Sequence, residues 1–442
     1  MAAHLNPEPR NPEPGTWNAE PGLGFHGLCF ATVAVAVFAI YARALSAFFF
    51  EDDFQLLVGS WNFDPANLLH LKARFKPVFE IYFWLGSAVF GRSTAAFHAA
   101  SLVVHVVNGW LVLAIARRLG MRPAFAFLTA LLFVVQPAYV AAVAWVGAIA
   151  ESLVVLFGCT SAYAILKLRE SGRRAWLAVA IATFALALFS HESGVVFLPI
   201  IILIDYVAAG RAAPWRDLVR VHWPIAAVAT AYLAITFSAN TPDYLGDEIG
   251  YRPGFHVVQN VFEYIAALYV GERKVLSHLA VAAVLAAVAW KGSPRARLGA
   301  AWMVLGILPF APFETGILSR YAYVPAIGLA LLMGEGLASL YAALTRKSSG
   351  LARGVVIALS VFICARFAYF ARDGVKGVYQ ASERYRTFLA DLRRERPDLP
   401  DHAVVTMSPE RDRIMARRFV EAAVQWEYRN QTLRVDVGEG GR

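Results

Sequence analysis

A series of apolar segments, each close to the length that crosses a lipid bilayer, constrains this chain more than any other feature. Of its residues, 58% are hydrophobic and 17% are charged, against roughly 25% charged in a soluble protein. Since a transmembrane helix needs about 20 predominantly apolar residues, we predict an all-α polytopic membrane protein with about 11 transmembrane helices. The segments are residues 28–48, 94–116, 122–140, 142–166, 175–190, 193–209, 220–239, 275–290, 297–312, 320–344 and 351–371.

Basic residues set the expected orientation, because they gather in every second loop between these segments. Cytoplasmic loops carry the excess of Lys and Arg, which places these loops in the cytoplasm and residues 49–93 on the outer side. Residues 1–27 are rich in Pro and Glu and lack a cleavage site, which predicts a disordered cytoplasmic tail. The basic residues are Arg117, Arg118, Arg122, Lys167, Arg169, Arg173, Arg174, Arg211, Arg216, Arg220, Lys291, Arg295, Arg297, Arg346, Lys347 and Arg353.

Two features of the pattern need interpretation. The net charge of +9 follows from these topology-determining loops, so no nucleic-acid partner is expected. Residues 256–271, "HVVQNVFEYIAALYVG", could cross the bilayer or lie flat on it. A crossing would put Arg295 and Arg297 outside, against the pattern of the other loops. We therefore predict an interfacial helix on the outer side.

The last part of the chain, residues 373–442, differs in character from the rest. It is dense in charge and has no run long enough to span a membrane. "HAVVTMS" and "TLRVDV" resemble strands, and "ERDRIMARRFVEAAVQWEYRN" resembles an amphipathic helix. With eleven spans the segment lies outside the cytoplasm. We predict a transmembrane domain over residues 28–372, followed by a small extracytoplasmic α/β domain over residues 373–442.

Three adjacent carboxylates stand where the first apolar segment ends, in "FFFEDDFQLL" at residues 48–57. Acids at the edge of a membrane carry an energetic cost, so three adjacent acids there call for an explanation. A carboxylate pair such as Asp52 and Asp53 suits a general base that deprotonates a hydroxyl, and it also suits a cation site. A solvated loop without a special role is the alternative.

Other polar residues lie in the same outer half. Together with the acids they would line a cavity suited to an anionic, lipid-linked substrate, since Arg binds phosphate with two parallel hydrogen bonds. Simpler roles stay open, because Glu151 and Glu192 could be members of ion pairs and Arg320 an interface anchor. No HExxH or CxxC spacing and no Gly-rich phosphate loop occurs, so neither a metal nor a cofactor is expected. The residues are Arg74, Lys76, Gln136, Tyr139, Trp145, Glu151, His191, Glu192, Arg320, Tyr321 and Tyr323.

The order of these motifs resembles a known family. After the acids come "RFKPVFEIYFWLGSAVF", "QPAYVAAVAWVGAIAESL", "LFSHESGVVFLPIIILIDY" and "SRYAYVPAIGL". This sequence resembles the multi-spanning GT-C glycosyltransferases. It is most similar to the transmembrane O-mannosyltransferases that target cadherins in animals and to their bacterial relatives, without their tetratricopeptide tail. The resemblance covers about residues 28–345.

The resemblance implies a polyprenyl-phosphate sugar as donor and an inverting transfer, with residues 49–93 as the catalytic outer loop. Asp52 matches the first acid of the family's pair, the base, and Asp53 matches the second. The substrate-binding positions that it implies are Arg74, Glu151, Glu192, Arg320 and Tyr321, with Arg320 and Tyr321 at the donor phosphate. Lys76 and His191, which stands where the family has a lysine, join them from the polar residues of the same outer half.

Two function classes follow from the sequence. The first is a glycosyltransferase that moves a mannose-like hexose to a hydroxyl of a protein, lipid or glycan on the extracytoplasmic side, and a ligase that moves a whole glycan would share its fold. The second is a transporter or flippase of lipid-linked sugars. A transporter would bury its acids near the membrane midplane, commonly between inverted repeats, whereas these acids follow the end of a segment. The abundance of Ala, Val and Arg suggests a bacterial inner membrane, with the site facing the periplasm.

Overall fold

The computed structural model describes residues 23–66, 75–209, 214–239, 250–252, 254–271, 274–313, 318–407 and 417–437, and every structural statement below concerns these residues. Most of the expected tail, residues 1–22, and the predicted site residue Arg74 lie outside them. The first helix begins at Leu23, so the boundary expected at residue 28 is five residues too late.

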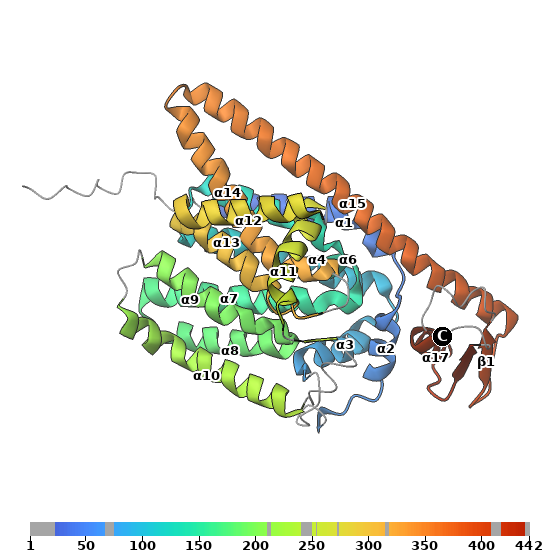
Figure 1. Cartoon of the computed structure of the whole chain (residues 1–442). Helices are drawn as coiled ribbons and strands as arrows, with labels where there is room; N and C mark the ends of the chain where they lie inside the picture. The colour runs from blue at the N-terminus through green and yellow to red at the C-terminus, as the bar shows by residue number, and fades with distance from the viewer. Residues whose placement is uncertain are drawn as a thin grey trace, which may run out of the picture.

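The main body is a bundle with one helix for each of the expected apolar segments (Figure 1). Their apolar side chains form a continuous core that runs along the bundle. This architecture confirms the all-α polytopic fold. The helices are α1 (Leu23–Tyr41), α4 (Thr94–Arg118), α5 (Pro123–Val134), α7 (Ile149–Ser171), α8 (Ala175–Ser190), α9 (Phe197–Ala208), α10 (Trp215–Ala239), α12 (Val275–Lys291), α13 (Pro294–Ile307), α14 (Tyr323–Thr345) and α15 (Ser349–Glu395).

The helices differ in whether they are long enough to cross a membrane alone. Within the described residues, seven helical segments are long and apolar enough, or eight if α12 and the helix before it form one bent span. Three other expected spans are helices of only 16, 12 and 14 residues, α8, α9 and α13. For example, α8 ends at Ser190, directly before the polar turn at His191. Hydropathy finds the apolar run but does not show where polar residues end its helix.

Short helices and turns gather at one end of the bundle, on the right in Figure 1. Consecutive bundle helices run in opposite directions, so the ends of α1, α5 and α8 and the starts of α4, α7 and α14 meet there. The outer loop, residues 49–93, supplies two of the short helices, α2 and α3. The elements are η2 (Ala42–Ser46), α2 (Asp52–Ser60), α3 (Pro77–Phe90), η4 (Pro137–Tyr139), α6 (Val140–Ala144), η5 (Val146–Ala148), η6 (Glu192–Val196) and η9 (Ser319–Ala322).

The ambiguous stretch at residues 256–271 is α11 (His256–Ile265), which continues in the π-turn η8 (Ala266–Val270). Tyr264 and Ile265 are buried against α13, while Val258 on another face is 62% exposed. The axis of α11 and η8 makes an angle of 98° with that of α12. The two therefore do not form one straight span, and the interfacial position of α11 stays a prediction.

The long helix α15 continues past the expected domain boundary at residue 372. It has 47 residues, about 70 Å at 1.5 Å per residue, whereas the apolar core of a bilayer is about 30 Å thick. The rise in charge near residue 373 does not end the helix, because Arg, Glu, Ala and Leu are all strong helix formers. A buried stripe at Ser382, Tyr385, Leu389 and Leu392 continues the helical period. The helix stops only before Pro397.

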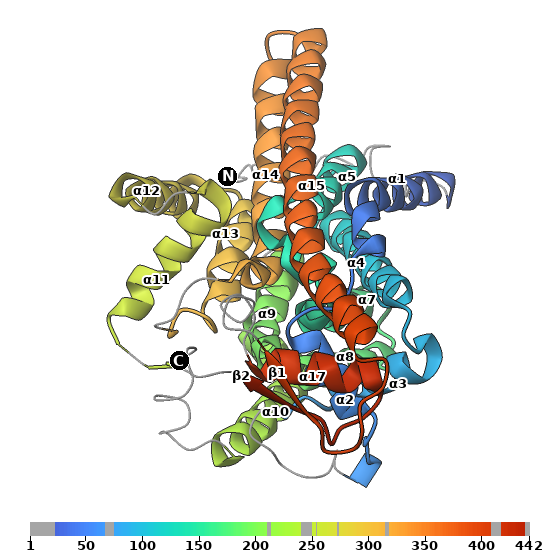
Figure 2. The same cartoon turned by 90° about the vertical axis from the view of Figure 1, so that its right-hand side faces the viewer.

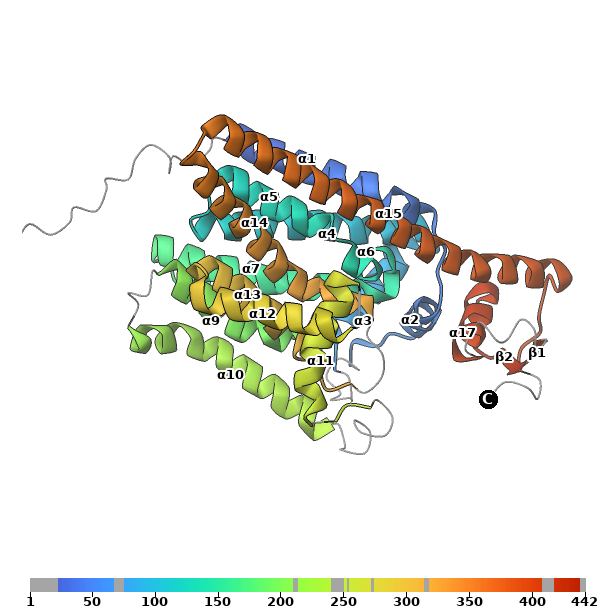
Figure 3. The same cartoon turned by 45° about the horizontal axis from the view of Figure 1, so that its top comes forward.

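After α15 the chain forms a small α/β unit (Figure 3). Strand β1 (Val404–Met407) pairs in parallel with β2 (Arg434–Val437), with Val404 opposite Arg434. Helix α17 (Arg417–Tyr428) lies between them in the chain and packs on β2. The described residues 396–407 and 417–437 are called the C-terminal unit below. Its strands and helix agree with the sequence pattern, but it starts more than 20 residues after the predicted boundary.

Buried polar side chains tie three helices of the bundle together. The hydroxyl of Tyr323 on α14 lies 2.8 Å from Nδ1 of His105 on α4. Asn108, one turn further along α4, donates to that hydroxyl (3.0 Å) and to the carbonyl of Ser152 on α7 (2.9 Å). Lipid offers no competing partners, so such bonds help to fix neighbouring spans.

Candidate active site

Asp53 is the most constrained of the three adjacent acids. Its side chain is fully buried. Oδ2 accepts the N–H of Phe50 (3.0 Å), and Oδ1 accepts the N–H of Gly147 (2.6 Å). Burial raises the pKa of Asp53 well above its usual range, and the two N–H donors oppose this rise. With both oxygens engaged, Asp53 joins the start of α2 to η5.

Position 147 has no room for a side chain, so glycine is the residue that fits there. A Cβ at this position would lie 2.9 Å from Oδ1 of Asp53 and 3.3 Å from Nε1 of Trp145. The ring of Trp145 in turn stacks on Phe50, with centroids 5.3 Å apart and an angle of 27° between the planes. Glycine thus allows this turn to approach the acid, and the tryptophan shields it.

The other two acids differ from Asp53. Glu51 has φ = 51° and ψ = −123°, a backbone conformation that costs a residue with a Cβ on the order of 1–3 kcal/mol. Burial raises the pKa of Glu51, as does the charge of Asp52, while Arg320 lowers it. Asp52 is half-buried at the first position of α2. In the part of the chain that the structure describes, no hydrogen bond or ion pair joins its carboxylate to another side chain, which leaves it available to a substrate.

A network of charged residues joins three elements nearby. Nζ of Lys76, just before α3, lies 3.0 Å from Oε2 of Glu192. Nδ1 of His191 lies 3.8 Å from carboxylate oxygens of both Glu192 and Glu151, and Ser193 donates to Glu151 (3.4 Å). Burial alone would raise the pKa of Glu192, but His191 and Lys76 outweigh it and lower the pKa to about 2. Glu192 is therefore a member of an ion pair with Lys76, whereas Glu151 lies beside His191 and Ser193 and pairs with no Lys or Arg among the described residues.

Arg320, on η9, is a cation between aromatic rings. Its guanidinium carbon lies 5.2 Å from the centroid of Trp145 and 5.6 Å from that of Tyr321. Tyr321 itself stacks on Phe310 at 3.9 Å. Within the described residues no carboxylate lies within 4 Å of Arg320, although its charge acts on Glu51 and Glu151. An arginine without a carboxylate partner can bind a phosphate through two hydrogen bonds.

Comparison with known proteins supports the fold and its family. A family model described as dolichyl-phosphate-mannose-protein mannosyltransferase matches residues 75–239. A protein O-mannosyl-transferase of Caenorhabditis elegans is 29% identical over 137 residues, which are 30% of this chain but only 19% of that protein.

Two solved structures have a similar fold. ArnT from Cupriavidus metallidurans, bound to undecaprenyl phosphate, matches with a TM-score of 0.57 and 12% identity over 95% of this chain and 87% of its own. The oligosaccharyltransferase AglB from Archaeoglobus fulgidus, in complex with an inhibitory peptide and a dolichol-phosphate, matches with a TM-score of 0.55 and 12% identity, over 92% and 64%.

The fold of this chain is therefore that of GT-C membrane proteins. The GT-C fold explains why residues far apart in the sequence meet at one end of the bundle. Contacts link α2 to η5, η4 and α6 to η9, and α8 to η6. The predicted site residues that meet there are Asp52, Asp53, Lys76, Glu151, His191, Glu192, Arg320 and Tyr321.

Some residues of this GT-C site differ from the sequence interpretation. Gln136 and Tyr139 are structural, because Gln136 caps η4 and Tyr139 donates to the carbonyl of Phe133. The sequence missed the role of Gly147, and it singled out Trp145 only as an aromatic near the site. A tryptophan two residues before a glycine, between two apolar segments, is the signal that could have found both.

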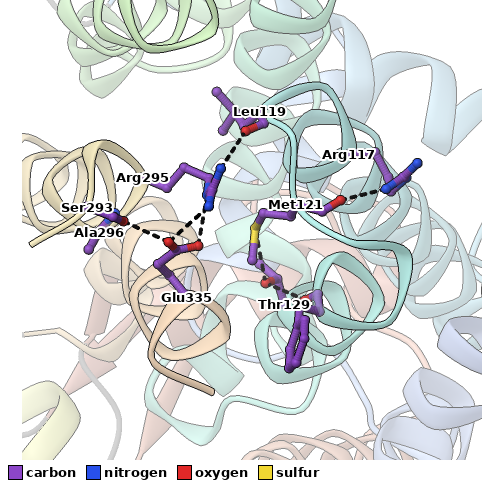
Figure 4. Close-up of polar contacts among 9 residues, drawn as sticks. Arg117, Leu119, Met121, Thr129, Ser293, Arg295, Ala296 and Glu335 are labelled. Carbon is purple, nitrogen blue, oxygen red and sulfur yellow. Dashed lines mark hydrogen bonds and ion pairs between the residues drawn. The ribbon is translucent and has the colours of Figure 1, made fainter. Parts of the chain in front are cut away.

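At the opposite end of the bundle, Arg295 and Arg169 pair with carboxylates, unlike Arg320. Figure 4 shows Arg295 bound to both carboxylate oxygens of Glu335, and Ser293 donating to the same carboxylate. A hollow of about 260 Å³ beside this pair is also lined by Arg122. Nearby helices carry a second such group, in which Asp205 accepts from Arg169 and His222.

Proposed function

We propose that this chain is a membrane glycosyltransferase that moves a mannose-like hexose from a polyprenyl-phosphate donor to a hydroxyl acceptor on the extracytoplasmic side. The observation that carries the proposal is that, among the described residues, the Asp52 carboxylate has no side-chain partner and lies at the same end of the bundle as Arg320, which has no carboxylate partner there. One group can accept a proton, and the other can hold a phosphate. Both are needed when a sugar leaves a lipid phosphate.

In the proposed reaction Asp52 acts as the general base. It takes the proton of the acceptor hydroxyl as that oxygen attacks the anomeric carbon of the donor. The bond from this carbon to the phosphate oxygen breaks, and the lipid phosphate leaves with the electron pair from the opposite face, so the configuration inverts. Proton transfer by a placed base typically contributes about 10²–10⁴-fold.

The cations and aromatic rings would stabilise the leaving phosphate. Arg320 binds its oxygens while the rings of Trp145 and Tyr321 hold the guanidinium in place. Lys76 is already paired with Glu192, so its part is to add positive charge nearby. Arg74 is proposed as a second phosphate contact. Preorganised positive charge of this kind stabilises the charge that develops in the transition state.

The remaining acids are proposed to organise the site. Asp53 holds the turn that presents Asp52, because both of its oxygens already accept N–H groups. Glu151 and His191 keep Glu192, and through it Lys76, in position. No step in this scheme requires a metal or a cofactor.

The relatives support the choice of donor. ArnT is described with undecaprenyl phosphate and AglB with a dolichol-phosphate, so a lipid phosphate suits this fold. Because the aligned stretch spans only 19% of the curated mannosyltransferase, the sugar and the acceptor, whether protein, lipid or glycan, are proposals. So are the periplasmic face of a bacterial inner membrane as location, the cytoplasmic tail at residues 1–27 and the extracytoplasmic side for the C-terminal unit.

The test compares membranes that hold the wild type, Asp52→Asn or Asp64→Asn. Asp64 is the matched control, an exposed aspartate of the same outer loop. Each membrane receives radiolabelled polyprenyl-phosphate mannose or, separately, the glucose donor. We expect label on an acceptor with the wild type and Asp64→Asn, and a loss of about 10²–10⁴-fold with Asp52→Asn.

Equal transfer by all three proteins would show that Asp52 is not the base. If none of them transfers sugar but labelled lipid crosses the bilayer in their presence, the chain is a transporter of lipid-linked sugars and the proposal is wrong.

A further inference from the structure

The helix that carries Asp52 cannot be stable alone. α2 has nine residues, and isolated helices shorter than about 12–15 residues are marginal in water. Its entry is also strained, because Glu51 lies at φ = 51°. Such a conformation persists only where the surrounding structure holds it. The question is therefore which part of the chain holds α2.

The C-terminal unit covers the start of α2 with one aromatic anchor. Trp426 of α17 is 4% exposed. Its ring packs edge-on against Phe48, Phe49 and Phe54, at centroid distances of 5.8, 5.6 and 5.5 Å. In the sequence, Phe48 and Phe49 lie two to three residues before the three acids, and Phe54 follows them directly. Figure 2 shows α17 lying against α2 at this end of the molecule.

The same unit also holds the other end of α2. Gln431 donates to the carbonyl of Val58 in the last turn of α2 (3.0 Å) and accepts from Asn62 just beyond it (2.6 Å). The carbonyls of a last turn have no partner within their helix. The carbonyl of Val58 accepts the N–H of Trp61 just beyond the helix (3.2 Å), and the Gln431 amide adds a second hydrogen bond to it.

Further contacts fix the unit in place. Arg92, after α3, lies 3.8 Å above the ring of Trp426 and pairs with Glu427 at 2.7 Å. From α15, Ser382 accepts the N–H of Phe48 (3.0 Å), and Tyr385 lies 5.5 Å from Phe54. The loop with the acids is thus enclosed between α15 and α17.

We propose that the C-terminal unit is a positioning element, which holds α2 through Trp426 and Gln431 and so fixes where Asp52 meets the substrate. The unit makes none of the contacts proposed for the donor phosphate, which come from η9, the residues just before α3 and the turn at Trp145. Its loss should therefore lower the turnover rate more than it weakens donor binding. The expected fall in turnover rate rests on the proposed function of Asp52. The claim that the C-terminal unit holds α2 in place does not depend on that function.

The experiment compares the full-length wild type with Trp426→Ala, Trp426→Phe and Tyr428→Phe. Tyr428 is the matched control, because its hydroxyl, on the same helix, donates to carbonyls at the end of α15 and just after it and not to α2. The first measurement is amide hydrogen exchange without substrate. In Trp426→Ala we expect the amides of residues 53–60 to exchange at least about tenfold faster, while those of α4 and α7 keep their rates. Trp426→Phe should restore much of the protection, and Tyr428→Phe should resemble the wild type.

The second measurement is sugar transfer with polyprenyl-phosphate mannose. A displacement of the base by about 1 Å can cost on the order of 10²-fold in rate, so kcat should fall by about that factor in Trp426→Ala. The KM for the donor should stay within about twofold, because uniform binding is unchanged. If Trp426→Ala does not accumulate, Gln431→Ala removes only the contacts at the far end of α2, and the same changes are expected on a smaller scale.

Unchanged exchange of α2 in both variants would overturn the inference, and so would faster exchange with an unchanged kcat. If instead the proposed function is wrong, the wild type itself transfers no sugar. In that case the exchange data alone decide whether the C-terminal unit holds α2.

Discussion

Replacing Gly147 with alanine tests the geometry of the site with a single methyl group. The new Cβ would lie 2.9 Å from Oδ1 of Asp53, and ordinary contact begins at 3.4 Å. The two groups must therefore separate by about 0.5 Å, the difference between these two distances. The hydrogen bond from the N–H of Gly147 to the same oxygen, now 2.6 Å, would weaken or break. Gly147 does not have a positive φ, so the backbone itself tolerates alanine and the contact is the cause.

The expected magnitude follows from the bond and the displacement. Leaving a buried polar group unsatisfied costs about 1–3 kcal/mol, so the free energy of unfolding should fall by that amount. Moving the turn that carries Asp52 should also reduce transfer by roughly 10²-fold, since small misplacements of reacting groups have effects of that size.

A glycine nearby provides the control. Gly59, also close to the acids but in α2, has nothing within 4 Å of its Cβ position. Because alanine is the better helix former, Gly59→Ala should raise stability by about 0.5–1 kcal/mol. Both variants are compared by equilibrium unfolding in mixed micelles and by sugar transfer. The reasoning is refuted if Gly147→Ala unfolds and transfers as the wild type does, or if Gly59→Ala is equally damaging.

Two further predictions concern stability. The depressed pKa of Glu192, about 2 against 4.5, means that its ion pair with Lys76 stabilises the fold fully above about pH 4.5 and loses this effect as the pH falls toward about 2. Unfolding measured over this range should therefore depend less on pH in Glu192→Gln, and an unchanged slope would contradict the assignment. Tyr323→Phe removes the shared hydroxyl between His105 and Asn108 and should lower the free energy of unfolding in micelles by about 1–2 kcal/mol. Wild-type stability would mean that water replaces the hydroxyl.

The helices could be predicted from the sequence because hydropathy is a local property. Each expected apolar segment is a helix, and the polar motifs in every second loop meet at one end because consecutive helices run in opposite directions. The helix ends were harder to predict. α9 is only 12 residues long, and α15 continues 23 residues beyond the expected boundary at 372, to Glu395.

The sequence predicted which residues belong to the candidate site, but not what each of their side chains contacts. Lys76, Glu192 and Arg320 were all expected to bind substrate. Lys76 and Glu192 form an ion pair, and of the three only Arg320 has no carboxylate or cation partner within the described chain. Asp52 and Asp53 are identical in side chain and adjacent in sequence. Their environments separate them, because Gly147 reaches Asp53 from 94 positions away in the chain.

The sequence by itself determined which segments form apolar helices for a bilayer, with three adjacent acids in an outer loop and most basic residues in the loops of the opposite side. Periodicity and charge suffice for this, because each residue responds to lipid or water wherever the rest of the chain lies. Only the tertiary structure decided which acid is buried and which is free, and that Trp426 packs beside Phe54. These outcomes depend on contacts between residues hundreds of positions apart, and no local pattern encodes the distance between them.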